Sequence, residues 1–300
     1  MANEDSAGYV GRFAPSPTGP LHFGSLLAAT ASYLEAKTNS GKWLLRIEDI
    51  DPPRASPHAE KYIIEALESY GFEWHGSVQF QSSEIARHLA LVDQLLADGL
   101  AYPCGCSRQD LADVPRGPLG HIYPGTCRRG CDDADVAIRI RTNVLPVAFY
   151  DGLQGPQEQR LETESGDFVI RRRDGLIAYH LAVVADDFAQ GVTDVVRGID
   201  LLDSTPRQIY LQQVLGYPTP RYAHIPIVTN AAGEKLSKAT GAAAVPTHQV
   251  RPTLIEALIA LGQSPPAELA DCHLDGIWSW ARENWNMGVL AGQTCVPMPR

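Results

Sequence analysis

The hydrophobic positions of this chain alternate between short apolar runs and stretches with helical spacing. Residues 10–14, 42–47 and 223–228 are short apolar runs typical of buried strands. Elsewhere apolar residues return every three or four positions, which predicts amphipathic helices. The predicted helices cover residues 25–36, 56–67, 83–98, 204–215, 252–261 and 274–285. Strands that alternate with helices favour an α/β fold with a parallel sheet.

Two of the predicted helices carry more specific expectations. Ser25 stands at the start of the helix of residues 25–36 and is expected to be its N-cap, because a serine side chain can accept from the first free backbone N–H groups. The helix of residues 83–98 has apolar residues along one face, which we expect to be buried. That face comprises Ile85, Leu89, Val92 and Leu96.

The middle of the chain follows a different pattern. Residues 136–141 alternate like a half-exposed strand, while residues 168–170 and 178–185 flank a turn at Asp174 and Gly175, which predicts a hairpin. We therefore expect a more β-rich insertion in this region. The predicted division is an α/β domain of residues 1–100 and 181–245, an insertion of residues 101–180, and a short helical region of residues 246–300.

The composition is that of an ordinary globular protein, with 300 residues, 44% of them hydrophobic and 20% charged. No apolar run reaches the length of a membrane helix, and the first residues lack the basic and apolar regions of a signal peptide, so we expect a cytoplasmic protein. The net charge of −10 disfavours a strongly basic nucleic-acid clamp. Arg171, Arg172 and Arg173 still form a local basic patch that can meet a phosphate backbone.

Four of the six cysteines fall in one segment of the sequence. Cys104 and Cys106 have C-x-C spacing, and Cys127 and Cys131 have C-x3-C spacing. Clustered cysteines in a cytosolic chain favour a metal site over a disulfide framework, and four thiolates suit a tetrahedral zinc ion. The alternative is a set of reduced, partly buried thiols.

Two distant loops are suited to holding a nucleotide triphosphate. His22 lies in a Pro/Gly-rich turn between a predicted strand and a predicted helix, where a helix N-terminus can attract phosphate. Lys235 and Lys238 lie in a polar loop much later in the chain and can stabilise negative charge from a second side. Either loop alone also fits a surface turn without a function.

Together the two loops resemble the signature motifs of the class I aminoacyl-tRNA synthetases. Residues 20–25 (PLHFGS) are similar to the HIGH motif, and residues 235–239 (KLSKA) are similar to the KMSKS motif. Residues 12–19 (RFAPSPTG) and 46–54 (RIEDIDPPR) resemble the glutamyl branch of this family. The four motifs occur in the order that the family has.

The end of the chain narrows the resemblance. A full glutamyl-tRNA synthetase continues after its lysine loop into long anticodon-binding domains, whereas only a short segment follows Lys238 here. The chain therefore resembles the truncated glutamyl-Q branch, and the HFGS form of the first motif and residues 123–127 (YPGTC) fit that branch. Ser25 and Ala239 depart from the usual class I residues, so the roles of those two positions do not carry over.

The resemblance implies a Rossmann-like catalytic domain. It would activate L-glutamate with ATP, accompanied by Mg²⁺, and transfer it to queuosine in the anticodon loop of tRNA(Asp). His22, Lys235 and Lys238 would be catalytic, and His22, Gly24 and Lys238 would bind ATP. The glutamate site would comprise Arg12, Phe13, Ala14, Pro15, Ser16, Glu48, Tyr179 and Arg197. We expect a monomer without membrane contact.

Side-chain chemistry is consistent with these implied roles. The guanidinium fork of Arg12 suits a carboxylate, Glu48 suits the α-ammonium group, Tyr179 suits a hydrogen bond, and Arg197 suits a second carboxylate contact. There is an alternative for three of them. Arg12 and Glu48 can pair with each other, and Tyr179 can simply pack in the core.

For the metal, the resemblance differs from the cysteine spacing. The family pattern implies that Cys104, Cys106, Tyr123 and Cys127 surround one zinc ion, while Cys131 remains a rival for the fourth position. Either set has four ligands and no open position for water, so the ion would be structural.

Other functions also remain open at this stage. They are a shortened synthetase that charges a tRNA 3′ end, a zinc-containing RNA-binding module without activity, and a nucleotidyltransferase that activates a small carboxylic acid without RNA.

Overall fold

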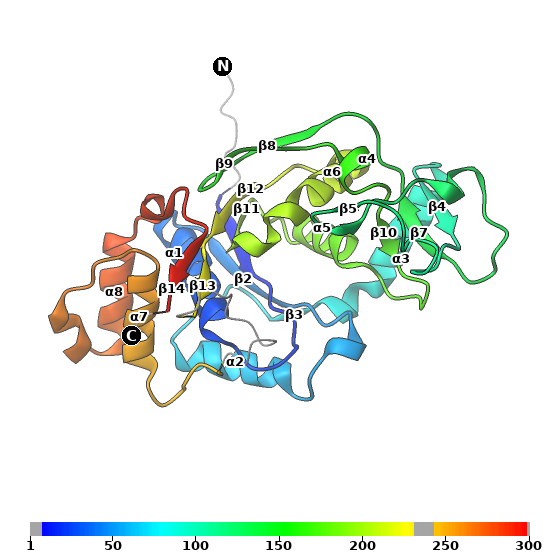
Figure 1. The fold of residues 1–300 in the computed structure, drawn as a ribbon. Helices are drawn as coiled ribbons and strands as arrows, with labels where there is room; N and C mark the ends of the chain where they lie inside the picture. Colours follow the sequence, from blue (N-terminus) through cyan, green and yellow to red (C-terminus); the bar gives the residue numbers. More distant parts are fainter. Residues whose placement is uncertain (1–7, 231–242, 299–300) are drawn as a thin grey trace, which may run out of the picture.

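The structure is a computed structural model of the chain, and it describes residues 8–230 and 243–298. Short parallel strands form its central layer (Figure 1). β1 (Val10–Phe13) pairs in parallel with β2 (Lys42–Ile47), which pairs in parallel with β3 (Gln79–Phe80). The strands predicted at residues 10–14 and 42–47 are thus confirmed, with the first ending one residue earlier.

A second group of strands lies beside the first. β11 (Asp194–Gly198) pairs in parallel with β12 (Arg221–Ile225), and β12 meets the hairpin of β8 (Val147–Asp151) and β9 (Gly155–Gln159). A hydrogen bond of 2.9 Å from the Thr193 N–H to the Val10 carbonyl joins the starts of β11 and β1.

The apolar run of residues 223–228 forms parts of two strands rather than one. β12 ends at Ile225, and β13 (Ile227–Thr229) begins after Pro226 and pairs in parallel with β14 (Cys295–Pro297). Proline has no backbone N–H to donate to a sheet, so the strand is interrupted there. The sequence pattern could not separate the two strands because both are apolar.

Helices pack on both sides of this layer (Figure 1). They are α1 (Phe23–Thr38), α2 (Ala59–Ser69), α3 (Ile85–Ala97), α4 (Leu161–Glu164), α5 (Tyr179–Ala189), α6 (Thr205–Leu215), α7 (Val250–Ala260) and α8 (Leu274–Asn284). Short 3-10 turns are η1 (Pro52–Arg54), η2 (Gln81–Glu84), η3 (Thr126–Arg129), η4 (Ile199–Ser204), η6 (Ala267–Asp271) and η7 (Met287–Leu290). All six helices predicted from the sequence are present, with ends shifted by a few residues.

The N-cap of α1 is not the predicted one. Ser25 lies inside the helix, and the cap is His22, whose side chain accepts a hydrogen bond from the Ser25 backbone N–H. Histidine is an uncommon N-cap, so a preference for serine pointed to the wrong residue. The rest of α1 is buried against the sheet, and Leu26, Leu27 and Leu34 are at most 1% exposed.

The predicted hairpin after residue 168 is only partly right. β10 (Val169–Arg171) is a strand, and Arg171 bridges Ile177 across the turn, but residues 179–189 form helix α5. Residues 181–187 are buried, so the apolar run has no polar face to reveal its period. Short apolar runs of this kind do not distinguish a strand from a buried helix.

The buried face of α3 also differs from the prediction. Val92 is buried as expected, but Ile85 and Leu89 are exposed by 41% and 37%. The helix instead buries His88, Leu91, Val92 and Leu95. His88 Nε2 donates a hydrogen bond of 2.7 Å to the carboxylate of Asp186 in α5, so the buried face of the helix includes a polar residue that a count of hydrophobic positions leaves out.

A small antiparallel sheet carries the cysteine-rich segment. Its order is β10, β7 (Ala137–Ile140) and β4 (Ala101–Cys104), which confirms the strand predicted at residues 136–141. β5 (Arg116–Gly117) and β6 (Gly120–His121) form a short hairpin nearby. In Figure 1 this sheet lies at the end of the molecule opposite α7 and α8.

The division into domains stays a prediction. One cluster of buried apolar residues joins α1, β2, α7 and α8. A second cluster joins α3, β7, α5 and α6, and so includes residues on both sides of the predicted boundaries at residues 100 and 180. The hairpin of β8 and β9, inside the predicted insertion, also reaches β12.

Candidate active site

A cavity of about 640 Å³ opens where β1, β2 and β11 end. Parallel strands of an α/β sheet place their ligand sites at this edge. The cavity brings together every predicted glutamate and ATP residue that the structure describes. These are Arg12, Phe13, Ala14, Pro15, Ser16, His22, Gly24, Glu48, Tyr179 and Arg197. Lys235 and Lys238 lie outside the described residues, and the roles of all these residues stay predictions.

A buried group of charges lies behind one wall of the cavity. Arg12 and Arg46 both pair with the carboxylate of Asp187, at 3.2 Å and 2.8 Å, and Arg46 also pairs with Glu48 at 3.2 Å. The ion pair between Arg12 and Glu48 that the sequence left open is therefore not formed. Each of the four side chains is at least nine-tenths buried, so the two positive and two negative charges compensate one another.

Burial and neighbouring charges shift the pKa values of the two carboxyl groups in opposite directions. Burial raises the pKa of Glu48, although Arg46 and Arg12 oppose the shift. Burial also acts to raise the pKa of Asp187, but Arg12 and Arg46 outweigh it and hold that pKa below its ordinary value. Asp187 was not predicted as a site residue, because nothing in the sequence connects it to Arg12, which lies 175 residues earlier.

Unlike Arg12 and Arg46, Arg197 is held by hydrogen bonds to an imidazole and a hydroxyl. Its Nε donates to the imidazole Nε2 of His224 at 3.1 Å, and its Nη2 donates to the hydroxyl of Thr205 at 2.9 Å. Its Nη1 is buried and has no hydrogen-bond partner among the residues that the structure describes. No carboxylate of residues 8–230 and 243–298 forms an ion pair with this guanidinium, in contrast to Arg12 and Arg46.

Tyr179 and His22 begin two of the helices that face the cavity. Tyr179 is the first residue of α5, and burial raises its pKa, so its phenol is neutral. His22 precedes α1 and lies with both ring nitrogens near Ser25, at 3.3 Å from its backbone N and 3.1 Å from its Oγ. The N-terminus of a long helix therefore reaches the cavity wall at Gly24, which is a favourable position for phosphate.

A smaller cavity of about 160 Å³ adjoins the first one. The two share the lining residues Ser16, Thr18, Glu48, Arg54 and Tyr179. The smaller cavity also has polar walls from Gln81 and Arg172.

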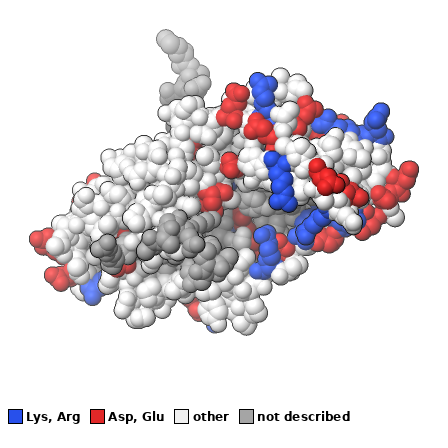
Figure 2. Space-filling model, in the orientation of Figure 1, with Lys and Arg blue, Asp and Glu red and all other residues white. Residues whose placement is uncertain are grey.

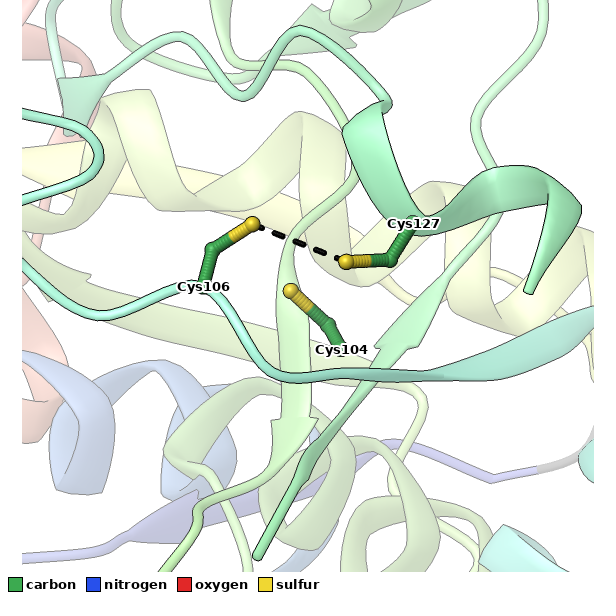
Figure 3. A group of neighbouring side chains, drawn as sticks. All are labelled: Cys104, Cys106 and Cys127. Atoms are coloured by element: carbon green, nitrogen blue, oxygen red, sulfur yellow. Dashed lines mark hydrogen bonds between the residues drawn. The ribbon is translucent and has the colours of Figure 1, made fainter. Parts of the chain in front are cut away.

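The cysteine-rich segment forms a compact cluster. The sulfur atoms of Cys104, Cys106 and Cys127 all lie within 4.8 Å of one another, and those of Cys106 and Cys127 are 3.6 Å apart (Figure 3). Cys104 ends β4 and Cys127 lies in η3, so the short sheet and the 3-10 turn position the sulfurs. In the part of the chain that the structure describes, this is the one group of three or more His, Cys, Asp or Glu side chains close enough to share a metal ion.

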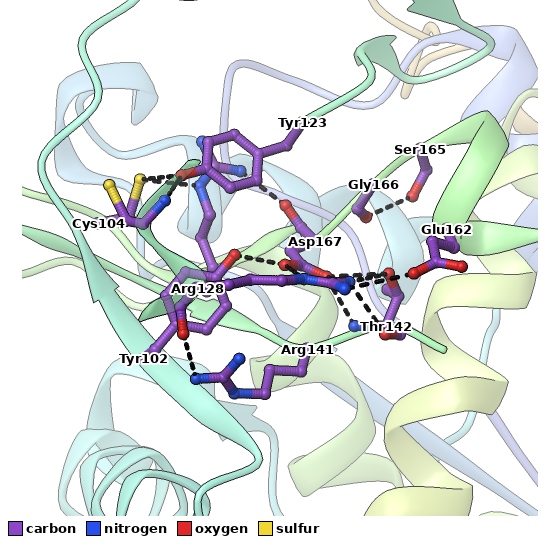
Figure 4. A network of polar contacts seen from close by, with 12 residues as sticks. Tyr102, Cys104, Tyr123, Arg128, Arg141, Thr142, Glu162, Ser165, Gly166 and Asp167 are labelled. Atoms are coloured by element: carbon purple, nitrogen blue, oxygen red, sulfur yellow. Dashed lines mark hydrogen bonds and ion pairs between the residues drawn. The ribbon is translucent and has the colours of Figure 1, made fainter. Parts of the chain in front are cut away.

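Tyr123 and Cys131 lie differently with respect to this cluster. The Tyr123 Oη is 3.3 Å from the Cys104 sulfur and 3.5 Å from the Cys106 sulfur, and it accepts a hydrogen bond from the Cys127 N–H (Figure 4). The Cys131 sulfur instead donates to Asp133 at 3.2 Å. The structure therefore brings the Tyr123 oxygen close to the three sulfurs, while Cys131 packs against the cluster and its sulfur is not one of the group.

Polar contacts of two arginines stabilise the segments that carry the cysteine cluster. The guanidinium of Arg139 lies 3.9 Å from the centre of the Tyr123 ring, and its Nε donates to the Cys104 sulfur at 3.3 Å. Arg128 of η3 pairs with the buried Asp167 at 2.6 Å, and Asp167 also accepts from the Thr142 N–H (Figure 4). The positive charge of Arg139 beside the sulfurs and the phenol can stabilise these groups in their negatively charged, metal-binding forms. Residues with these spacings and donors fit a tetrahedral zinc ion.

No helix in the described part of the chain is long and apolar enough to cross a membrane.

Comparison with known proteins agrees with the motifs. The family described as tRNA synthetases class I (E and Q), catalytic domain, matches residues 9–120 and 121–285. A glutamyl-Q tRNA(Asp) synthetase of Ectopseudomonas mendocina is 54% identical over 279 residues, covering 93% of each chain. One of Pseudomonas aeruginosa is 52% identical over 296 residues, covering 98% of this chain and 99% of its own.

Solved structures support the same fold. A glutamate tRNA ligase of Elizabethkingia meningosepticum, solved with its amino acid, has a TM-score of 0.81 at 24% identity and matches 97% of this chain and 67% of its own. This similarity concerns the fold alone, while the curated relatives and the family match concern the sequence. The chain therefore belongs to the class I tRNA synthetases for glutamate and glutamine, in the group of the glutamyl-Q tRNA(Asp) synthetases.

Proposed function

We propose that this protein activates L-glutamate with ATP and transfers the glutamyl group to queuosine at the wobble position of tRNA(Asp). The observation that carries the proposal is the cavity in which Arg12, Glu48, Tyr179 and Arg197 meet the N-terminus of α1. The close relatives that bear the name glutamyl-Q tRNA(Asp) synthetase support the choice of substrates.

Glutamate recognition follows from the charges around the cavity. Glu48 supplies a carboxylate for the α-ammonium group, and its pairing with Arg46 orients it. Arg12 and Arg197 supply guanidinium groups for the two carboxylates of the ligand. Arg197 has no carboxylate partner among the described residues, so binding an acidic side chain neutralises a charge that the protein leaves unmatched.

In the activation step, an oxygen of the α-carboxylate of glutamate attacks the α-phosphorus of ATP, and the bond between this phosphorus and pyrophosphate breaks. The protein contributes mainly by placing the reactants and stabilising the charge that develops. His22 and the start of α1 line the cavity, which supports a role for them in contacting the phosphates. Lys235 and Lys238 are proposed for the same task on the basis of their motif, and Mg²⁺ accompanies ATP as a counter-charge.

In the transfer step, a hydroxyl of the cyclopentenediol of queuosine attacks the carbonyl of the mixed anhydride, and AMP leaves. The smaller cavity beside Glu48 and Tyr179 offers room for a second reactant next to the glutamate pocket. On the face in Figure 2, most Lys and Arg side chains lie over the half of the molecule that carries the cysteine cluster, mixed with acidic ones. Such a surface suits local contacts with an RNA loop more than a continuous grip on a duplex.

We further propose that Cys104, Cys106, Tyr123 and Cys127 hold one structural zinc ion. The close sulfurs, the adjacent phenol oxygen and the cation of Arg139 beside them support this set. Four protein ligands leave no position for a reactive water. When bound, zinc would cross-link β4 and η3.

The test of the proposed function uses tRNA(Asp) in three forms with labelled glutamate and ATP. We expect tRNA(Asp) with queuosine to be glutamylated and the same tRNA with guanosine at the wobble position to remain unlabelled. Removal of the 3′-terminal adenosine should leave the reaction intact, because the acceptor group is in the anticodon loop.

Two outcomes of this test would select another function. Labelling of the guanosine form that is lost on 3′ trimming would establish an enzyme that charges tRNA 3′ ends, an activity compatible with the fold shared with the glutamate tRNA ligase. Activation of glutamate without labelling of any tRNA would instead indicate a nucleotidyltransferase that uses no RNA.

A further inference from the structure

A row of three buried side chains runs from the β8–β9 hairpin to the cavity. Asp151 of β8 contacts His224 of β12 at 2.5 Å, between a carboxylate oxygen and Nδ1, and His224 contacts Arg197 of β11 at 3.1 Å. Asp151 and His224 have no exposed surface, and Arg197 is 5% exposed. Three strands that are neighbours in one sheet thus contribute one residue each.

The contacts determine where the imidazole carries its proton. A carboxylate can only accept, so Nδ1 of His224 donates to Asp151. The guanidinium of Arg197 can only donate, so Nε2 of His224 accepts from its Nε. The imidazole is therefore neutral, in agreement with burial, which lowers the pKa of His224 although Asp151 opposes that shift.

A neutral partner has a consequence for the charge of Arg197. Arg12 is paired with the carboxylate of Asp187 before any ligand arrives. Arg197 is held just as firmly, by His224 and Thr205, yet neither partner is negatively charged. Its Nη1 also has no hydrogen-bond partner within residues 8–230 and 243–298. The site therefore combines a fixed orientation with a guanidinium that has no carboxylate in direct contact among the described residues, so an anionic group of the ligand can form that ion pair.

We infer that Asp151 and His224 are positioning residues that hold Arg197 through a neutral imidazole and so reserve its charge for the side-chain carboxylate of glutamate. They thereby contribute to the choice of glutamate over glutamine, whose amide cannot neutralise Arg197. This inference rests on the proposed function of the cavity.

The variant Asp151→Asn tests the inference with little change in shape. One oxygen of Asp151, Oδ1, accepts from the backbone N–H groups of Leu153, Gln154 and His224 at 3.0, 2.9 and 3.1 Å. The asparagine oxygen should keep these three contacts, which turns its NH₂ group toward Nδ1 of His224. The imidazole proton must then move to Nε2, where it faces the N–H of Arg197, and two donors oppose each other.

We expect Asp151→Asn to raise the KM for glutamate by about 10- to 100-fold, the usual effect of losing a hydrogen bond to a charged group, and to change kcat much less. The preference for glutamate over glutamine should fall by a similar factor. The nitrogen chemical shifts of His224 should show that the unprotonated nitrogen has changed from Nε2 to Nδ1. Glu158→Gln, which makes the same exchange at an exposed position of the same hairpin, is the matched control and should match the wild type.

An inverted tautomer with an unchanged KM for glutamate would overturn the inference, as would an unchanged tautomer. If Asp151→Asn does not fold, His224→Gln and His224→Leu decide instead. Glutamine offers Arg197 an amide oxygen near the place of Nε2 and should keep the KM within a few-fold of the wild type, whereas leucine should raise it at least about tenfold. Equal KM values for these two variants would also overturn the inference.

The wild-type protein separates this inference from the proposed function. Pyrophosphate exchange into ATP that does not depend on glutamate in the wild type would refute the proposed function. Glutamate-dependent exchange in the wild type, with the same KM in Asp151→Asn, would refute only the positioning role.

Discussion

At the scale of single residues, the arginines around the cavity differ in what compensates their charge. Arg12 and Arg46 share Asp187, whereas the side chains that bond Arg197 in the described part of the chain, His224 and Thr205, are neutral. Asp187 therefore has a structural task in addition to any effect on the ligand. It is the one carboxylate that contacts both Arg12 and Arg46 among the described residues, and it is buried with them.

We predict that Asp187→Asn lowers the free energy of unfolding by about 3 kcal/mol, because it leaves two buried guanidinium groups with Glu48 as their one remaining ion-pair partner among the described residues. Urea unfolding at pH 7 measures the effect. Asp93→Asn, at an exposed position of α3, removes a carboxylate outside the group and should change the free energy by less than about 0.5 kcal/mol. A loss below about 1 kcal/mol in Asp187→Asn would contradict the prediction.

His180 gives a second prediction, for the dependence of stability on pH. Burial, with Arg207 and Arg197 nearby, lowers its pKa from 6.5 to about 3. Below pH 6.5 the unfolded chain therefore takes up a proton that the folded chain does not. The free energy of unfolding should fall as the pH decreases from 6.5 toward 3, by at most about 1.4 kcal/mol per pH unit from this residue.

His180→Phe should remove this part of the pH dependence. Urea unfolding of both proteins between about pH 7 and 5 measures it, and the wild type should lose about 1 to 2 kcal/mol more than the variant over that range. Between about pH 7 and 8 the two curves should run parallel, since the histidine is neutral in both states there. Identical slopes below pH 6.5 would show that His180 does not contribute.

The residues of the cavity differ in how readily the sequence reveals them. Arg12, His22 and Glu48 stand in motifs that can be recognised directly. Asp187 and His224 could not be found in this way, because their contacts connect residues 175 and 27 positions apart and leave no local pattern. For Asp187, the sequence offered one indication of a buried charged site: the acidic pair Asp186 and Asp187 at the end of an apolar run.

At the scale of elements, β1 and β2 were predictable because their apolar residues stand in short runs bounded by polar turns. Helix α5 was not, because it is buried over most of its surface and its apolar residues therefore show no helical period. The position of β8 beside β12 was also beyond prediction, since strands pair across the chain through contacts that a local pattern does not encode. That pairing is what brings Asp151 to His224.

The contact between β4 and η3 at the cysteine cluster leads to a prediction for the zinc content of the protein and for its effect on stability. If β4 and η3 are joined by zinc, the purified protein should contain about one zinc per chain, and Cys104→Ser should lose the metal and lower the melting temperature. Metal content by mass spectrometry and thermal unfolding measure the two effects. A fully active preparation without bound metal would contradict the structural zinc.

The fourth ligand is tested by a matched pair of variants. Tyr123→Phe removes the oxygen that lies 3.3 Å from the Cys104 sulfur and should weaken zinc binding about 10-fold or more. Cys131→Ser changes a sulfur that contacts Asp133 instead and should leave the affinity unchanged. Competition with a zinc chelator measures both. The reverse result would assign Cys131 to the metal.

At the scale of the whole molecule, the described residues that we propose for glutamate line one cavity in the protein alone. Arg12 lies in β1, Glu48 directly after β2, Tyr179 in α5 and Arg197 in β11. Contacts within the chain hold Arg12, Glu48 and Arg197. A site that is preorganised in this way needs no RNA to complete it. Activation of glutamate and its transfer to RNA should therefore be separable steps.

We predict that the protein exchanges pyrophosphate into ATP when glutamate is present and RNA is absent. Lys238→Ala should reduce this exchange about 100-fold or more, the usual effect of removing a group that stabilises charge in the transition state. Lys61→Ala, at an exposed position of α2, removes the same charge away from the cavity and should leave the rate unchanged. Exchange that begins only after tRNA is added would mean that RNA completes the site, and an unchanged rate in Lys238→Ala would remove this lysine from the mechanism.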